Sequence, residues 1–198
     1  MSPDSSLVLE QELRRHGLFT PPVHEKLSIY IRELERWSSR VNLTSLRGEE
    51  LIRRLVVEPS KIGRQLQMSG TLVDIGSGNG SPGIPLYLTL GLASVHLVEA
   101  RTRRAAFLRH VANLVDPEKI IVHKDRLEDI EDGAGRVDWV SMQAVYPSAV
   151  LLAALRRWSD ATTRVVWITS IDTPPSPTAQ AIREGGSVRA WVFQLDQS

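Results

Sequence analysis

The sequence predicts an α/β fold in which a helical N-terminal extension precedes a doubly wound, mainly parallel β-sheet. Two observations predict it. From residue 71 onward, short β-rich runs alternate with helical runs, and most of the β-rich runs are apolar, as strands buried on both faces of a parallel sheet are. Residues 1–68 carry helical signals only. We therefore expect a helical extension over 1–68 and an α/β domain over 69–198, packed as one compact unit.

An apolar stripe identifies the main helix of the extension. Thr20 provides an N-cap, and Pro21 suits the first turn because a missing N–H costs nothing there. Apolar residues then recur at spacings of three and four, as in an amphipathic helix, at Val23, Leu27, Tyr30, Leu34, Trp37 and Val41. This places Tyr30 and Trp37 in the core rather than on a base-stacking surface. We expect further helices from Ser5 or Ser6 to Gly17, over Gly48–Val57 with Pro59 as the stop, and over Ser60–Met68.

The remaining residues predict six strands with helices between them. The strands are expected over Thr71–Ile75, Ser94–Val98, Lys119–His123, Val137–Met142, Thr163–Thr169 and Val188–Leu195. The helices are expected over Pro82–Leu90, Thr102–Val115, Ser148–Trp158 and Thr178–Glu184. Because crossovers between parallel strands are right-handed, a ligand is expected at the carboxyl ends of the first strands.

Composition excludes several classes of protein. The 198 residues are 42% hydrophobic and 24% charged, as in globular domains, and they contain no cysteine. This rules out disulfide scaffolds, cysteine-ligated zinc, iron–sulfur clusters and thiol catalysis. The five histidines are scattered without ligand spacing, so no metal site is expected. The longest apolar run, Ala149–Leu155, is too short to span a membrane, and we expect a cytoplasmic monomer.

Charge is unevenly distributed along the chain. Residues 61–110 hold six basic residues against two acidic ones, although the whole chain has a net charge of only +1. The excess indicates either an anionic partner near this segment or ordinary solvated surface charge.

A glycine-rich turn follows the first expected strand and opens a helix. Asp74 precedes three alternating glycines, Gly76, Gly78 and Gly80, and Glu99 ends the next strand. Glycines let the backbone approach a bulky ligand, and a carboxylate at Glu99 can accept hydrogen bonds from both hydroxyls of a ribose. An acid before three alternating glycines favours S-adenosylmethionine, a cationic cofactor, over a nicotinamide dinucleotide, although the dinucleotide fingerprint is formally satisfied as well. A glycine-rich turn without a ligand is the third interpretation.

The motifs of the chain resemble those of one family. The matching segments are Val41-Asn42-Leu43-Thr44, Asp74-Ile75-Gly76-Ser77-Gly78, Pro82-Gly83-Ile84-Pro85-Leu86, Leu97-Val98-Glu99-Ala100 and Arg126-Leu127-Glu128. In this order and spacing they resemble the bacterial small-subunit rRNA (guanine-N7)-methyltransferases, also called glucose-inhibited division protein B. The resemblance implies a Rossmann-like class I S-adenosylmethionine-dependent methyltransferase that methylates N7 of a guanine in small-subunit rRNA or in the 30S subunit.

The resemblance also implies a set of site residues. The family's cofactor contacts would map onto Gly76, Ser81, Glu99, Leu127 and Glu128, with Arg126 beside them. The expected cofactor site also includes Asp74, Gly78 and Gly80 of the glycine turn, and Gln143. A second set comes from the residues themselves: either the arginines bind RNA, because guanidinium groups suit phosphates and bases, or they are ordinary helix-surface charges beside acidic neighbours. They are Arg53, Arg54, Arg101, Arg103 and Arg104. Guanine N7 carries a lone pair and no proton, so no general base is needed and no catalytic residue is assigned.

Four positions depart from the family pattern. Ser81 stands where the family has an aromatic or aliphatic residue, Leu55 replaces a histidine, Gln143 replaces an arginine, and Thr169 replaces a lysine. Loss of the positive charge at Gln143 weakens the expectation of rRNA methylation more than that of cofactor binding. Two hypotheses follow: an active methyltransferase, on rRNA or on a changed substrate, or a relative that binds S-adenosylmethionine or RNA without turnover.

Overall fold

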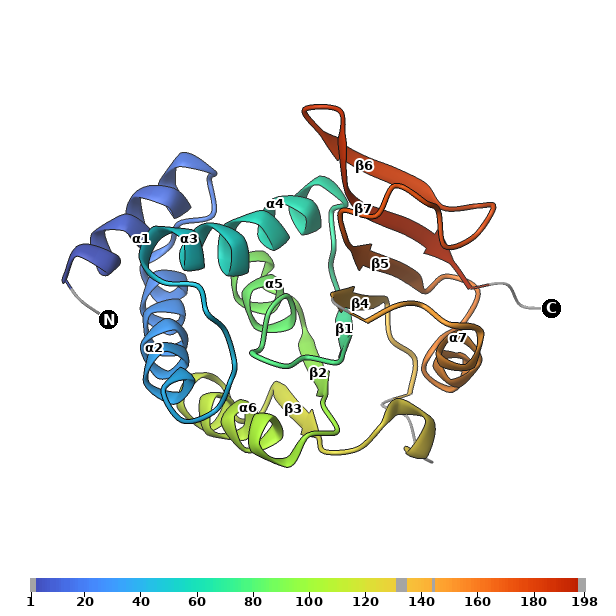
Figure 1. Cartoon of the computed structure of the whole chain (residues 1–198), viewed down its shortest axis with the longest axis horizontal. Helices are drawn as coiled ribbons and strands as arrows, with labels where there is room; N and C mark the ends of the chain where they lie inside the picture. Colours follow the sequence, from blue (N-terminus) through green and yellow to red (C-terminus); the bar gives the residue numbers. More distant parts are fainter. Residues whose placement is uncertain (1–2, 131–134, 144, 196–198) are drawn as a thin grey trace.

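A seven-stranded sheet forms the centre of the computed structural model, which describes residues 3–130, 135–143 and 145–195. The strand order is β3-β2-β1-β4-β5-β7-β6 (Figure 1). The strands are β1 (Thr71–Ile75), β2 (Ser94–Val98), β3 (Ile120–His123), β4 (Trp139–Gln143), β5 (Arg164–Ile168), β6 (Gln180–Glu184) and β7 (Ser187–Gln194). Strands β1 to β5 are parallel, whereas β7 runs antiparallel to both β5 and β6.

Helices cover both faces of the sheet (Figure 1). Helices α5 (Gly83–Leu90) and α6 (Thr102–Val115) lie on one face, and α7 (Ala149–Leu155) lies on the other with the 3₁₀ turns η2 (Leu127–Asp129) and η3 (Arg156–Trp158). The N-terminal helices form an outer layer against α5 and α6; they are α1 (Pro3–Arg15), α2 (Pro21–Ser38), α3 (Gly48–Ile52), the π-helical turn η1 (Arg53–Val57) and α4 (Glu58–Gln65).

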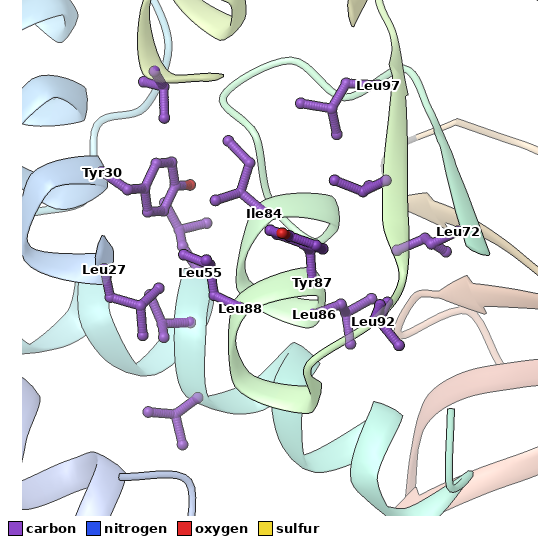
Figure 2. Packing of buried hydrophobic residues seen from close by; sticks show 14 of the residues in the cluster. Leu27, Tyr30, Leu55, Leu72, Ile84, Leu86, Tyr87, Leu88, Leu92 and Leu97 are labelled. Atoms are coloured by element: carbon purple, nitrogen blue, oxygen red, sulfur yellow. The ribbon is translucent and has the colours of Figure 1, made fainter. Parts of the chain in front are cut away.

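The N-terminal helices share one hydrophobic core with the α/β part. Tyr30 of α2 and Leu55 of η1 pack near Ile84 and Leu88 of α5 (Figure 2), and all four side chains are buried. Tyr30 is therefore a core residue, as the helical stripe predicts. This packing fixes the N-terminal helices beside the glycine turn that precedes α5.

The strand order reverses between β1 and β4, and this reversal positions the site. In open α/β sheets, ligands bind outside the carboxyl ends of the strands at such a switch point. Here Ile75 of β1 pairs with Val98 of β2 on one side and with Met142 of β4 on the other. The glycine turn after Ile75 therefore lies between the ends of β2 and β4.

The helix predicted over Thr178–Glu184 is wrong, because Gln180–Glu184 forms β6. This strand pairs with β7 through a turn at Gly185 and Gly186, whose φ angles are +58° and +82°. Two successive positive φ angles are typical of a tight hairpin turn that matches the twist of its strands. The sequence did not show this strand because it contains helix-forming residues such as Gln180 and Glu184. With β6 included, the sheet has seven strands rather than the predicted six.

The stop predicted at Pro59 is also wrong, because the chain stays helical from Gly48 to Gln65. A proline cannot donate a hydrogen bond, and its ring excludes the carbonyl four residues earlier from the usual helical position. Here the turn before Pro59 widens into η1, where the amide of Glu58 donates to the carbonyl of Arg53, five residues back. The wider turn accommodates Pro59 and leaves the carbonyl of Leu55 available for another donor.

Among the residues that the structure describes, no helix is both long and apolar enough to cross a membrane.

Candidate functional site

The glycine turn adopts a backbone that other residues rarely adopt. Gly76, Gly78 and Gly80 have φ angles of +71°, +52° and +94°, in the left-handed region that favours glycine. The amides of Gly76 and Ser77 donate to the carbonyl of Val98 at 2.9 and 3.1 Å. The turn is thereby held against the end of β2, next to Glu99.

Glu99 and Gly78 form the centre of the site. The amide of Gly78 donates to Oε2 of Glu99 at 3.0 Å, and the amide of Arg101 donates to Oε1 at 2.8 Å. A Cβ atom on Gly78 would stand 3.6 Å from the Arg104 guanidinium and 4.0 Å from the Glu99 carboxylate. A Cβ at position 78 would therefore be in van der Waals contact with its neighbours, in a backbone conformation that favours glycine.

Gly76 and Gly80 serve the packing of the turn. A Cβ on Gly76 would lie 2.5 Å from Val145, and one on Gly80 would lie 2.7 Å from Ile84. The hydroxyl of Tyr30 also donates to the carbonyl of Asn79 at 3.1 Å. The outer helix α2 thus supports the turn directly, a role that the helical stripe alone does not reveal.

Asp74 lies beneath the turn and has no exposed surface. The hydroxyl of Ser141 donates to Oδ1 of Asp74 at 2.6 Å. Burial, together with a smaller effect of nearby Glu99, raises the pKa of Asp74 to about 7 against the lowering effect of hydrogen bonds from the Ser141 hydroxyl and the Gly83 amide. The structure therefore connects Asp74 to β4 and to the start of α5, while direct contact with a ligand stays a prediction.

Ser81 contacts Leu55, so two positions that depart from the family pattern meet. The hydroxyl of Ser81 donates to the carbonyl of Leu55 at 2.8 Å, and both side chains are buried. It is the same carbonyl that Pro59, four residues later, cannot pair with because proline has no N–H. The predicted ligand role of Ser81 is untested, but its contact with the N-terminal helices is clear.

The predicted group at residues 126–128 lies beyond β3. Leu127 is buried beside Val98, whereas Arg126 and Glu128 are exposed. The Arg157 guanidinium donates to the carbonyl of Glu128 at 2.8 Å. The strand pairing brings this segment to the same edge as Glu99, whose amide donates to the carbonyl of His123 at 3.0 Å.

The predicted RNA-binding arginines flank the glycine turn on two sides. Arg101, Arg103 and Arg104 lie at the start of α6, and Arg104 also donates to the carbonyl of Asn42 at 3.2 Å. Arg53 and Arg54 lie on η1, with about half of each side chain exposed. Arg53 pairs with Glu58 at 2.5 Å, and Arg54 lies 3.8 Å from Glu50.

Gln143 ends β4 and borders a cavity of about 340 Å³. The cavity lies between the η1–α4 helix, the ends of β4 and β5, and the β6–β7 hairpin. Its lining includes Arg54, Gln143 and Thr169, three positions that the sequence analysis singled out for separate reasons. Another wall of the cavity is formed by the β6–β7 hairpin, which the sequence did not predict.

The histidines are not all scattered, which corrects the sequence analysis. Nδ1 of His96 on β2 lies 2.9 Å from Nε2 of His123 on β3, and the two rings stack with centroids 5.2 Å apart. Both rings meet the Trp158 ring nearly edge-on. Burial lowers the pKa of His96 to about 4 and also lowers that of His123. His96 pairs with Ile121, so His123 lies two residues further along β3 and on the same face of the sheet, a proximity that linear spacing does not show.

Known proteins share the sequence and the fold of this chain. The sequence profile of the GidB family, rRNA small subunit methyltransferase G, matches residues 23–170. Ribosomal RNA small subunit methyltransferase G of Granulibacter bethesdensis is 39% identical over 135 residues, which are 67% of this chain and 62% of that protein. The protein of the same name from Geotalea uraniireducens is 35% identical over 119 residues, 58% of this chain and 53% of that protein.

These matches cover only part of the relatives. The chain spans about half to two thirds of the length of these two proteins. A solved SAM dependent methyltransferase from Aquifex aeolicus superposes with a TM-score of 0.54 at 15% identity, covering 74% of this chain and 93% of that one. The fold is therefore the Rossmann-like class I methyltransferase fold. The profile match covers most of the chain, and the protein belongs to the rRNA small subunit methyltransferase G family.

Proposed function

We propose that the protein is an S-adenosylmethionine-dependent methyltransferase that transfers a methyl group to N7 of a guanine in small-subunit rRNA. The observation that supports this proposal best is the Glu99 carboxylate, which accepts a hydrogen bond from the Gly78 amide of the glycine turn at the switch point of the sheet. We further propose that the protein acts in the cytoplasm as a monomer, on rRNA or on the 30S subunit.

The residues of the glycine turn fit the cofactor. A carboxylate has about four acceptor sites, and the amides of Gly78 and Arg101 use two of those on Glu99. The remaining sites suit the two hydroxyls of a ribose. Gly76 and Gly80 hold the shape of the turn, and Asp74 holds it from beneath.

The outer parts of the cofactor would meet other predicted residues. Leu127 and Glu128 would border the adenine, because their segment follows β3 at the edge next to Glu99. Arg126 would lie beside them, and Gln143 would face the methionine part from the end of β4. Ser81 would affect cofactor binding only indirectly, by holding the glycine turn, since its hydroxyl already donates to the carbonyl of Leu55.

For methyl transfer to guanine N7, the protein mainly has to position the two reactants. When bound, S-adenosylmethionine supplies an electrophilic methyl group on a sulfonium. Guanine N7 is an unprotonated nucleophile, so no side chain has to remove a proton. The protein's contribution is to hold the acceptor in line, to exclude water and to provide electrostatic complementarity.

The arginines on either side of the turn would bind the phosphates of the RNA. Arg101 and Arg103 are exposed at the start of α6, and Arg53 and Arg54 are half-exposed on η1. Phosphate contacts position an RNA without reading its sequence. RNA affinity should therefore fall steeply as the salt concentration rises.

One observation favours a second candidate, a relative that binds S-adenosylmethionine or RNA without methylating rRNA. Gln143 stands at the end of β4, where the family has an arginine, and a neutral amide lacks the Coulomb attraction of a guanidinium for a phosphate or carboxylate. A methyltransferase with a changed substrate would share this feature.

Calorimetric titration together with a transfer assay distinguishes these functions. The purified protein is titrated with S-adenosylmethionine and, separately, with NADH, and is then incubated with labelled S-adenosylmethionine and small subunits that lack N7 methylation. We expect cofactor binding and labelled rRNA. Binding without label supports the second candidate, and binding of NADH alone contradicts the proposal altogether.

A further inference from the structure

The segment that joins α2 to α3, residues 39–47, lies beside the glycine turn (Figure 1). We call it the α2–α3 segment. The side-chain amide of Asn79 in the turn donates to the carbonyl of Leu43 at 3.5 Å, and the side chain of Leu43 is buried. The hydroxyl of Tyr30 on α2 donates to the carbonyl of Asn79. The outer helical layer therefore reaches the proposed cofactor site through this segment.

Arg104, in the first turn of α6, lies between the α2–α3 segment and the cofactor site. Its Nη2 atom donates to the carbonyl of Asn42 at 3.2 Å. Its Nη1 atom stands 3.6 Å from the position of a Cβ atom on Gly78, and Oε2 of Glu99 stands 4.0 Å from that same position. A guanidinium has more N–H donors than the one bond to Asn42 uses. Arg104 thus contacts the segment on one side and borders the expected ribose position on the other.

The α2–α3 segment carries two exposed cations, Arg40 and Arg47. Among the residues that the structure describes, neither forms an ion pair with a carboxylate; Arg47 donates to two main-chain carbonyls of the segment itself, which leaves its charge in place. The two arginines of η1, by contrast, each have an acidic partner. Guanidinium groups without an acidic partner suit the phosphates that position an RNA. The segment is therefore a better phosphate-binding surface than η1.

We propose that Arg104 couples the two binding events, so that the cofactor and RNA each bind more tightly when the other is present. This inference rests on the proposed function and concerns the regulation of the same site. A ribose at Glu99 holds the Arg104 guanidinium, which in turn holds the Asn42 carbonyl and the α2–α3 segment. RNA then binds cations on a segment that is already ordered, and it pays a smaller entropy cost. Such coupling is reciprocal.

Binding of small ribosomal subunits that lack N7 methylation, measured with and without saturating S-adenosylhomocysteine, tests the coupling without methyl transfer. Arg104→Ala removes the link between the two sites. The double variant Arg40→Ala/Arg47→Ala removes the cations of the segment and leaves the Arg104–Asn42 hydrogen bond, whose acceptor is a main-chain carbonyl. Arg109→Ala is the control, because it removes the same charge from an exposed position further along α6.

The unaltered protein and Arg109→Ala should bind the subunits at least about fivefold more tightly with S-adenosylhomocysteine than without it. Arg104→Ala should bind them more weakly, and with the same affinity in both conditions. The double variant should also lose the dependence on S-adenosylhomocysteine, while its affinity for S-adenosylhomocysteine in the absence of subunits stays unchanged. The ratio of the two affinities is the decisive quantity, because a merely structural or phosphate-binding role of Arg104 lowers both affinities and leaves their ratio intact.

Three results overturn the inference: equal binding by the unaltered protein in the two conditions, no binding of subunits at all, or an unchanged ratio in Arg104→Ala. An unchanged ratio in the double variant overturns the part played by Arg40 and Arg47. Failure of the proposed function is distinguishable, since it shows as an absence of methyl transfer while the ratio behaves as expected. Methyl transfer without any coupling, conversely, contradicts only the role of Arg104.

Discussion

The hydroxyl of Ser81 donates a 2.8 Å hydrogen bond to the main-chain carbonyl of Leu55. The contact joins the glycine turn to the N-terminal helices at the point where Pro59 prevents normal helical pairing. A buried carbonyl that loses its donor costs about 1–3 kcal/mol. The bond therefore contributes both to stability and to the position of the turn.

Ser81→Ala should lower the free energy of unfolding by about 1–3 kcal/mol, because the Leu55 carbonyl then lacks its donor. Urea denaturation measures the change. Ser38→Ala is the matched control, since its hydroxyl donates to Leu34 within the α2 helix itself. An equal loss of unfolding free energy in the two variants would show that the Ser81–Leu55 hydrogen bond contributes no more than one within a helix.

Gly78→Ala should weaken S-adenosylmethionine binding at least tenfold, because the added methyl group stands 4.0 Å from the Glu99 carboxylate, where we expect the ribose. Its positive φ should also lower stability by roughly 1–2 kcal/mol. Gly91→Ala is the control: Gly91 has a φ of +64°, and nothing stands within 4 Å of a Cβ there. Both variants should lose similar stability, and only Gly78→Ala should lose affinity. Unchanged affinity would mean that the glycine turn does not bind S-adenosylmethionine and is only a connection between β1 and α5.

The stacked His96–His123 pair should make the protein less stable in acid. The folded-state pKa of His96, about 4, lies below its ordinary value of 6.5, so protonation favours the unfolded chain. The contribution of His96 is complete above pH 6.5 and decreases as the pH falls towards 4. Burial also lowers the pKa of His123, although the negative charge of nearby Asp125 partly raises it again.

His96→Phe keeps an aromatic ring against Trp158 and removes this titration. Denaturation between pH 7.5 and 4.5 should show a smaller acid loss for His96→Phe than for the unaltered protein. His24→Phe, outside the pair, provides the comparison. Parallel pH profiles for all three proteins would contradict this account.

Asp74→Asn should stabilise the protein increasingly as the pH rises. The folded-state pKa of Asp74, about 7, lies above its ordinary value of 3.8, so the fold favours the protonated form and loses stability as the pH rises from 3.8 through 7. Asparagine keeps an acceptor for the Ser141 hydroxyl without the buried charge. The difference in unfolding free energy between variant and unaltered protein should be larger at pH 8 than at pH 5. A difference independent of pH would refute the shifted titration.

Local patterns predicted the two strands that flank the glycine turn correctly. Strands β1 and β2 begin and end at the predicted residues, and Gly78 and Glu99 meet as expected. Their positions follow from strand periodicity and from the glycine turn, which are signals within one short segment. The ligand roles of the site residues, Arg126 and Gln143 among them, stay predictions.

The histidine pair and the cavity depend on contacts between segments that are distant in the sequence. The histidine pair requires the register of β2 with β3, and the cavity requires the β6–β7 hairpin opposite α4. Lys61 of α4 reaches Glu184 of β6, 123 residues later in the chain. Helical propensity around residue 180 predicts the wrong element there, because pairing with β7 outweighs it.

Transfer of labelled methyl to small ribosomal subunits that lack N7 methylation tests the central claim most directly. After incubation with the protein and labelled S-adenosylmethionine, the rRNA is cleaved selectively at N7-methylated guanines and the label is mapped. We predict label at N7 of one guanine, and much less label with Gly78→Ala when the S-adenosylmethionine concentration is below saturation. Tight binding of S-adenosylmethionine with no label in the rRNA would contradict the account.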